Sequence, residues 1–324
     1  MNPAAHPTGN ALHLKSLLGT ESLKTEQIQI LISTALAFKD RWDQQEPIPP
    51  TLAGKSVVML FFEASTRTRS SFELAVQRLG GNPLVLTKSG SSTEKGETLL
   101  DTAKNIEAMD PDLLVLRHPS AGTPFLLDKT LSLPIVNAGD GFHEHPTQAL
   151  LDLMTIFERR KRIQGIRVLI VGDIAHSRVA RSDIYALQAM GAEVSVCGPP
   201  TLLPPKVEKM GVTLFHHLEQ AVENQDVVMM LRIQHERFSS GQSPSKGEYA
   251  RFYGMNQRIL EMCSSDVLIM HPGPVNRGVE LSTEVADSSR SVILNQVANG
   301  VFLRMAVMHL LLGGEPFSWK ESVR

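Results

Sequence analysis

Residues 55–79, KSVVMLFFEASTRTRSSFELAVQRL, decide the fold of the first half of this protein. A short, almost continuous apolar run, Lys55–Phe62, gives way to hydroxyl and arginine residues, and a helical periodicity follows at Arg69–Leu79. Apolar runs without polar alternation are typical of parallel strands that are covered on both faces. The stretch therefore predicts a strand, a turn and a helix of an α/β domain.

The same alternation continues along the chain. Eight further strands are expected: Pro83–Thr87, Leu113–Arg117, Pro134–Asn137, Arg167–Val171, Glu193–Cys197, Val212–Phe215, Val227–Leu231 and Val267–Met270. Helical periodicities occur at Glu97–Met109, Gln148–Arg160, Val179–Met190 and Gln296–Leu312. Strands that alternate with helices favour parallel sheets with helices on both faces. We predict an α/β protein made of doubly wound parallel sheets.

The length of 324 residues favours two domains, because single cores usually stop growing below this size. We place the division at the helix near Gln148–Arg160, which has four predicted strands before it and five after it. Residues 1–149 form the first predicted domain and 150–295 the second, and the helix in 296–324 is expected to pack back on the first. Ligands of such folds bind beyond the carboxyl ends of strands. An active-site cleft is therefore expected between the domains.

The composition excludes several classes of partner. The chain is 42% apolar and 20% charged with a net charge of −2, and it lacks a basic tail, so no nucleic-acid partner is expected. The apolar runs fall far short of the ~20 residues that a membrane helix needs, and Met1–Leu14 lacks the pattern of a secretory signal. We expect a cytoplasmic protein without membrane contact. Of two cysteines, Cys197 ends an apolar run and is expected to be a buried thiol.

An anion site is predicted where the first strand ends. Ser65, Thr66, Arg67 and Thr68 stand between this strand and its helix. Free N–H groups and the positive end of the dipole favour an anion at a helix start, and hydroxyl and guanidinium donors match phosphate. A plain serine or threonine N-cap is the alternative. A P-loop is excluded, because the glycines and the GK[ST] sequence are absent.

Two later strand ends carry further polar residues. Arg117 precedes His118-Pro119, and residues 143–148 read HEHPTQ. A metal pair of His143 and His145 is disfavoured, because no carboxylate cluster apart from Glu144 accompanies it, and no metal is predicted. We interpret His118 and His143 as local structure and His145 as the functional histidine.

The second half adds arginines at strand ends. Residues 171–178, VGDIAHSR, lack the three spaced glycines of a dinucleotide site, so no NAD is expected. Arg178 closes this segment, and Arg232 and Gln234 follow a later strand. The turn at 271–278, HPGPVNRG, is either a site with carbonyl acceptors or an ordinary proline–glycine loop.

From Leu52 to Leu312 these motifs resemble, in order and spacing, those of the aspartate/ornithine carbamoyltransferase family. The resemblance implies that carbamoyl phosphate binds in the first domain and the amino acid in the second, without a cofactor. It assigns the following residues to carbamoyl phosphate: Ser65, Thr66, Arg67, Thr68, Arg117, His145, Gln148, Gly273 and Pro274. Among these, His145, Arg117 and Thr68 would be catalytic, since donors of this kind stabilise charge that develops on a carbonyl oxygen.

The resemblance also indicates the acceptor amino acid. It implies that L-aspartate is held by Lys95, Arg178, Arg232 and Gln234. Three cations suit a dianion and would repel ornithine. Ornithine enzymes carry cysteines in the histidine motif and in the later turn, and this chain has none at either place.

The resemblance further implies a homotrimer with shared sites, in which Ser91 and Lys95 of one subunit reach the neighbouring subunit. It also implies that Glu63 pairs with arginines of the second domain. A regulatory chain or a dihydroorotase-like partner is left open. A non-catalytic protein that closes on an acidic ligand is the competing interpretation.

Overall fold

The structure is a computed structural model, and it describes residues 12–87, 97–233 and 244–317. The chain divides into two compact units: Met1–Met154 with Asn299–Val323, and Thr155–Ala298 with Arg324. Both dividing points lie inside helices, α5 (Pro146–Arg160) and α11 (Ile293–Leu311). Each of these helices therefore contributes residues to both units.

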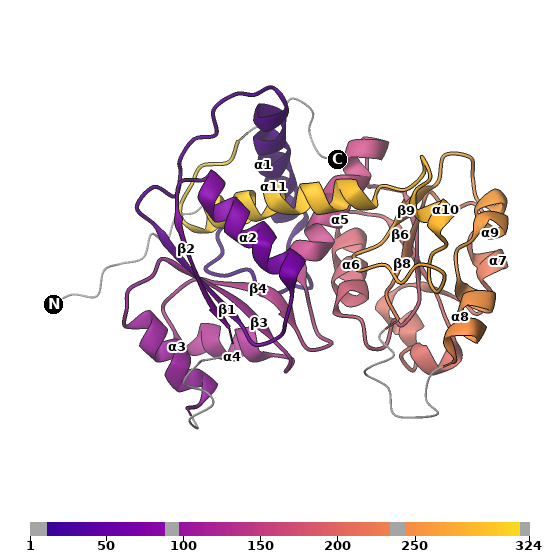
Figure 1. Cartoon of the computed structure of the whole chain (residues 1–324), viewed down its shortest axis with the longest axis horizontal. Coiled ribbons are helices and arrows are strands. Elements are labelled where there is room, and N and C mark those ends of the chain that lie inside the picture. The colour runs from indigo at the N-terminus through magenta and orange to yellow at the C-terminus, as the bar shows by residue number, and fades with distance from the viewer. Residues whose placement is uncertain (1–11, 88–96, 234–243, 318–324) are drawn as a thin grey trace. The chain divides into compact units, whose positions relative to one another are not determined.

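The first unit contains a parallel sheet in the order β2-β1-β3-β4 (Figure 1). Its strands are β1 (Ser56–Phe61), β2 (Asn82–Thr87), β3 (Leu113–His118) and β4 (Ile135–Asp140). Its further helices are α1 (Thr25–Asp43), α2 (Thr66–Arg78), α3 (Leu99–Glu107) and α4 (Thr123–Thr130). Figure 1 shows α3 and α4 on one face of the sheet and α2 on the other.

The apolar residues of these strands explain why both faces are covered. Leu60 and Leu116 point to one face, where they share a buried cluster with Ile106 of α3 and Leu127 of α4. On α2, Phe72 and its apolar neighbours are buried. A sheet that is buried on both faces needs apolar residues at consecutive positions, which is the pattern of the sequence.

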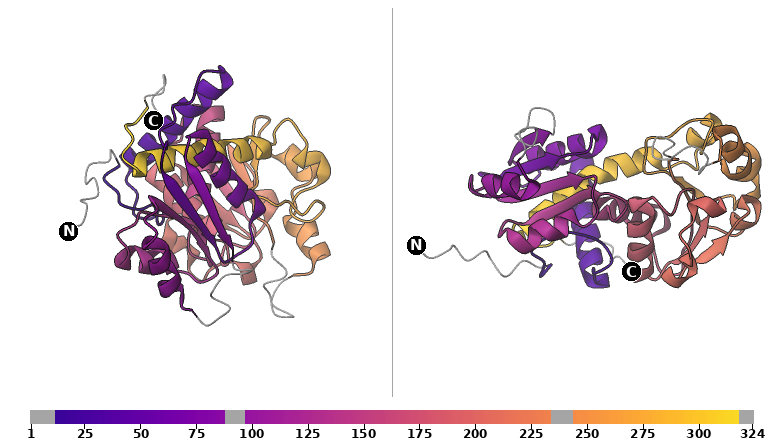
Figure 2. Two further views of the ribbon diagram at one scale, coloured as in Figure 1. Left: turned by 60° about the vertical axis from the view of Figure 1, so that its left-hand side comes forward. Right: turned by 90° about the horizontal axis from the view of Figure 1, so that it is seen from below.

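The second unit contains a parallel sheet in the order β7-β6-β5-β8-β9. Its strands are β5 (Arg167–Val171), β6 (Glu193–Cys197), β7 (Thr213–Phe215), β8 (Val227–Met230) and β9 (Leu268–Met270). The helices α6 (Arg178–Ala189), α7 (Leu218–Ala221), α8 (Lys246–Tyr253), α9 (Gln257–Met262) and α10 (Thr283–Ala286) complete it (Figure 2). Residues of α7 and α9 form one buried cluster with β5, β8 and β9.

The predicted fold class of two parallel-sheet α/β domains is confirmed. All nine predicted strands exist, and their ends agree within one residue except at β4, which ends at Asp140 rather than Asn137. The pairing of β3 with β4 continues past an irregularity between Leu116 and His118, and this lengthens β4. None of the helices in the described ranges has the length and apolar character needed to cross a bilayer.

Each sheet has a point where the strand order reverses. From β1 the chain moves to β2 on one side, whereas β3 lies on the other side of β1. In the second unit, β6 and β8 flank β5 in the same manner. In open α/β sheets, ligands bind outside the carboxyl ends of strands at such a point. The ends of β1 and β3, and separately those of β5 and β8, are therefore the expected ligand positions.

Candidate functional site

The predicted phosphate residues begin helix α2, directly after β1. Ser65 stands at the N-cap in an extended conformation, and its side chain makes no capping hydrogen bond within the described residues. The first turn of α2 contains no acidic residue. Thr66 and Arg67 are exposed, while Ser65 and Thr68 are half-buried. Ser65 therefore does not form the plain N-cap that was the alternative interpretation. The helix start offers N–H groups together with hydroxyl groups to an anion.

Arg117 lies beside this helix start. It pairs with Phe61 in the register of β1 and β3, and its carbonyl accepts from the N–H of Phe62 at 2.9 Å. The guanidinium is buried, donating from Nη1 to the carbonyl of Ala138 at 3.1 Å and from Nη2 to Glu63 at 2.7 Å. These two contacts, one on each side, fix the plane of the guanidinium. A buried and oriented cation can stabilise charge that develops on a bound oxygen.

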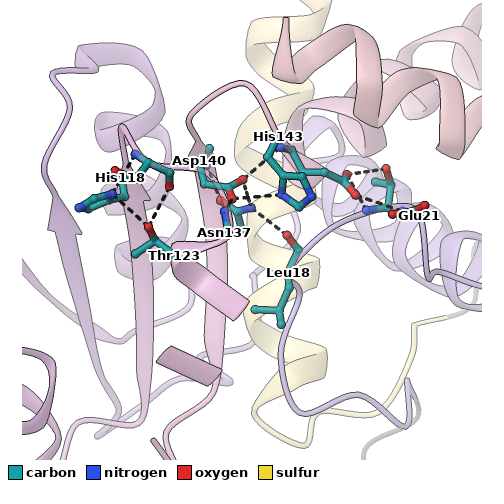
Figure 3. Close-up of polar contacts among 12 residues, drawn as sticks. Leu18, Glu21, His118, Thr123, Asn137, Asp140 and His143 are labelled. Atoms are coloured by element: carbon teal, nitrogen blue, oxygen red, sulfur yellow. Dashed lines mark hydrogen bonds and ion pairs between the residues drawn. The ribbon is translucent and has the colours of Figure 1, made fainter. Parts of the chain in front are cut away.

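The segment that carries His145 is held by Asp140 at the end of β4 (Figure 3). The buried carboxylate of Asp140 accepts from the N–H groups of Gly122 at 2.7 Å and Glu144 at 3.0 Å and from Asn137 Nδ2 at 2.8 Å. Its Oδ2 also lies 3.1 Å from His143 Nδ1. A carboxylate with several donors resists displacement. Asp140 therefore fixes the turn that leads to His145.

Glu144 ties the same turn to the amino-terminal part of the chain. Its buried carboxylate accepts from both the N–H and the hydroxyl of Thr20 at 2.8 and 2.9 Å and from the N–H of Glu21 at 3.3 Å (Figure 3). A Cβ at position 19 would lie 2.3 Å from Glu144 Oε1, so Gly19 is required for this approach. Glu144 is occupied by backbone and hydroxyl donors, which argues against a role as a metal ligand.

His145 and Gln148 stand at the start of α5 with their side chains buried. The carbonyl of His145 accepts from the N–H of Gln148 at 2.9 Å, so the two residues share the first turn. Because β3 and β4 are neighbours, this turn and Arg117 lie at the same edge of the sheet. The first unit thus brings the start of α2, Arg117, His145 and Gln148 to the carboxyl ends of adjacent strands.

The other two histidines of this region have local contacts. His118 Nδ1 accepts from the N–H of Ser120 at 3.0 Å and lies 3.1 Å from the hydroxyl of Thr123. Burial lowers the pKa of His118, which keeps the ring neutral and able to accept. With His143 beside Asp140, both rings organise their own turns.

In the second unit, Arg178 begins α6 after β5 and is buried. The side chain of Ser177 caps this helix, accepting from the N–H of Ala180 at 3.1 Å. The N–H of Leu231, just after β8, donates to the carbonyl of Val171 at 2.8 Å, which places Arg232 close to the end of β5. Arg178 and Arg232 therefore stand at neighbouring strand ends of one sheet.

The turn after β9 is held by a buried histidine. His271 Nδ1 accepts from the N–H of Gly273 at 2.8 Å, and its Nε2 lies 3.4 Å from Glu280 Oε1. The same Glu280 oxygen accepts from the N–H of Asn276 at 3.0 Å. This arrangement fixes the backbone of Gly273 and Pro274, whose peptide bond is cis. The turn is therefore an organised structure.

The arrangement in the first unit suits a small phosphorylated carbonyl compound, and that in the second unit suits an acidic ligand. Within the described ranges no group of three or more histidine, cysteine or carboxylate residues could hold a metal ion.

Two family models match the chain. The carbamoyl-phosphate-binding domain of aspartate/ornithine carbamoyltransferases matches residues 15–158, and the aspartate/ornithine-binding domain matches residues 164–311. The aspartate carbamoyltransferase catalytic subunit of Syntrophotalea carbinolica is 50% identical over 94% of this chain and 97% of its own length, and that of Geotalea daltonii is 51% identical over 93% and 97%.

Solved structures agree with these matches. Aspartate transcarbamoylase from Trypanosoma cruzi in complex with carbamoyl phosphate and aspartate has a TM-score of 0.84 at 31% identity, covering 96% of this chain and 99% of its own. Ornithine carbamoyltransferase from Pyrococcus furiosus has a TM-score of 0.84 at 30% identity, with 92% and 97% covered. The chain belongs to the aspartate/ornithine carbamoyltransferase family. The resemblance drawn from the sequence is confirmed.

The structure brings together only part of the residues predicted for a carbamoyltransferase site. Those of the first unit surround the carboxyl ends of β1, β3 and β4: Ser65, Thr66, Arg67, Thr68, Arg117 and His145, with Gln148 in the first turn of α5 next to His145. Ser91, Lys95 and Gln234 lie outside the described residues.

Sequence reasoning did not foresee how the residues around the proposed site are oriented. It assigned Glu63 to arginines of the second domain, and within the first unit Glu63 accepts from Arg117. Asp140 organises the histidine turn, and Asp152 and Arg304 lie buried behind it. A signal for the last two was available, since each is a charged residue within an otherwise apolar helical run, 149–154 and 301–308.

Proposed function

We propose that this protein transfers the carbamoyl group of carbamoyl phosphate to the amine of L-aspartate, giving N-carbamoyl-L-aspartate and phosphate. The observation that carries the proposal is the placement of Arg117, His145 and Gln148 beside the acid-free start of α2. The carbamoyltransferase relatives, about half identical over nearly the whole chain, support it.

Carbamoyl phosphate is a dianion next to a polar carbamoyl group, and the first unit offers partners for both parts. The phosphate binds at Ser65, Thr66, Arg67 and Thr68. Arg117, His145 and Thr68 donate to the carbonyl oxygen, where negative charge increases as the tetrahedral intermediate forms. The carbonyl of Gln148 accepts from the carbamoyl NH₂, and the backbone at Gly273 and Pro274 offers further acceptors.

L-aspartate binds through its carboxylates to Arg178 and Arg232, with Lys95 and Gln234 as further partners. Arginine is suited to this task because its planar fork meets a carboxylate with two parallel hydrogen bonds. An ornithine side chain, which is a cation, would be repelled by the same groups. This preference decides between the two acceptors that the family uses.

The reaction needs no protein nucleophile, since the amine attacks the carbamoyl carbon directly and phosphate leaves. Catalysis then consists of positioning two anionic substrates and stabilising the oxyanion. The departing phosphate is basic enough to accept the amine proton.

We further propose a homotrimer in which Ser91 and Lys95 complete the site of a neighbouring subunit. The reaction places the protein early in de novo pyrimidine biosynthesis, in the cytoplasm. A regulatory chain or a dihydroorotase-like partner is compatible with this assembly. The mass of the native complex tests both the trimer and the presence of a partner chain.

The test of the activity is product formation. Purified protein should form N-carbamoyl-L-aspartate from carbamoyl phosphate and L-aspartate, and L-ornithine in place of aspartate should give little citrulline. Faster turnover of ornithine would contradict the acceptor assignment. Binding of both substrates without product would favour the non-catalytic interpretation.

A further inference from the structure

A pair of buried charges lies behind the carbamoyl-phosphate residues of the first unit. Asp152 is on α5, one turn after Gln148, and Arg304 is on the part of α11 that belongs to the same unit. Both side chains are buried. Buried charges are costly unless they are paired, so their retention in apolar helices calls for a reason.

Asp152 determines how the Gln148 amide is turned. Nε2 of Gln148 lies 3.1 Å from each of the two carboxylate oxygens of Asp152. An ionised carboxylate can only accept hydrogen bonds, so the NH₂ group of Gln148 must face Asp152. The carbonyl oxygen of the amide then faces away from Asp152 and is left to accept from a donor.

Arg304 supplies a buried positive charge that interacts with Asp152. Its guanidinium donates from Nη1 to the carbonyl of Gly300 at 2.9 Å and lies 3.4 Å from the hydroxyl of Thr147. It also lies 4.9 Å above the ring of Phe72. Burial, and then the neighbouring charge of Arg117, lower the pKa of Arg304 to about 9, and Asp152 opposes this shift. A cation beside a buried carboxylate favours its charged form.

The chain makes room for this guanidinium. A Cβ at position 300 would lie 2.5 Å from Arg304 Nη1, so a larger residue there would displace the guanidinium from its present position along α11. Thr147, which Arg304 contacts, stands between His145 and Gln148. Arg304 is thus locked against the turn that carries two of the proposed carbamoyl ligands.

We propose that Asp152, supported by Arg304, is a positioning residue that turns the Gln148 amide so that its carbonyl accepts from the NH₂ of carbamoyl phosphate. The pair thereby selects a carbamoyl group over an acetyl group, which has a methyl group in place of the NH₂. This inference rests on the proposed function, because it concerns the same site.

The test compares the binding of carbamoyl phosphate and acetyl phosphate to the protein without aspartate. Dissociation constants follow from the rise in Tm with ligand concentration. In Asp152→Asn the new amide can donate to Gln148, which lets the glutamine amide turn over. Loss of one neutral hydrogen bond should weaken the binding of carbamoyl phosphate about three- to tenfold, and the dissociation constant of acetyl phosphate should change less than about twofold.

Four further variants make the result specific. Gln148→Leu removes the amide and should therefore show the largest loss of preference for carbamoyl phosphate over acetyl phosphate. Adding Asp152→Asn to Gln148→Leu should cause no additional loss of this preference. If Asp152→Asn fails to fold because Arg304 is left uncompensated, Asp152→Leu with Arg304→Met removes both charges and should show the same loss. Asp112→Asn is the control, since Asp112 binds Lys55 and the N–H of Ser56 at the opposite ends of the strands.

The preference for carbamoyl phosphate should fall in the Asp152 variants and persist in Asp112→Asn. Retention of the wild-type preference in folded Asp152 variants would overturn the inference, and so would an equal weakening of both ligands. If the wild-type protein forms no carbamoyl aspartate but the preference shifts as expected, the proposed function fails and the positioning role stands. If the wild-type protein forms carbamoyl aspartate but the Asp152 variants keep its preference for carbamoyl phosphate, the positioning role fails and the proposed function stands.

Discussion

Removing the carboxylate of Glu63 should impair the oxyanion site without dismantling the fold. Glu63 accepts from Arg117 Nη2 at 2.7 Å, with 22% and 9% of the two side chains exposed. Once Glu63 is gone, the guanidinium keeps its contact to the carbonyl of Ala138 and can pivot about it. An orienting bond between charged groups is worth about 1.5–3 kcal/mol, which corresponds to a roughly ten- to hundredfold loss of kcat if Arg117 acts in the transition state.

We therefore expect Glu63→Ala to lower kcat about ten- to hundredfold, and Glu63→Gln, which keeps a neutral acceptor, to lower it about three- to tenfold. Steady-state kinetics with saturating substrates measure this effect. Glu73→Gln is the matched control, because Glu73 on α2 pairs with Arg69 at 3.5 Å in a more exposed position, with 30% and 41% of the two side chains exposed. Its kcat should equal that of the wild type. An unchanged kcat in folded Glu63→Ala would refute the orienting role of this contact.

His145→Ala should lower kcat about 10²–10³-fold. Phosphate should still raise the Tm of this variant, because the residues proposed to bind phosphate lie on another helix. An equal loss of phosphate affinity would reassign His145 to ground-state binding. Burial raises the pKa of the Cys197 thiol from 9.0 to about 12. Between these pH values the unfolded chain loses the thiol proton and the folded protein keeps it, so the free energy of unfolding should fall as the pH rises from 9 to 12. Denaturant melts should show a weaker loss in Cys197→Ala. Mixed Lys95→Ala and Arg67→Ala chains should regain activity in hybrid trimers; hybrids as inactive as their parents would exclude shared sites.

The strands and the phosphate motif are predictable from the sequence because local features encode them. A continuous apolar run such as 57–61 has no stable place except between two covering layers, so strand β1 follows from the local sequence. The hydroxyl and arginine residues after it stand where a strand ends and a helix starts, as predicted, and that local position is the basis for proposing an anion site. The buried state of Cys197 follows from its place in an apolar run.

The supporting residues are harder to predict because their partners are remote in sequence. Asp140 looks like an ordinary turn residue until β3 and β4 pair and bring Gly122 within 2.7 Å of it. Arg304 is separated from Thr147 by 157 positions, and only the return of α11 brings them together. Periodicity specifies which face of a helix is buried, but it does not specify what lies against that face.

The two reversal points of strand order offer similar backbone geometry to the two proposed ligands, and the N-cap residues distinguish them. At the start of α2, the Ser65 side chain makes no capping bond within the described part of the chain, so a compact phosphate can meet the helix N–H groups directly. At the start of α6, Ser177 already accepts from the N–H of Ala180, so an anion there must be met by side chains. Arg178 begins that helix, and its fork matches a carboxylate. The difference between the two caps is therefore consistent with the proposal that phosphate binds in the first unit and the carboxylates of aspartate bind in the second.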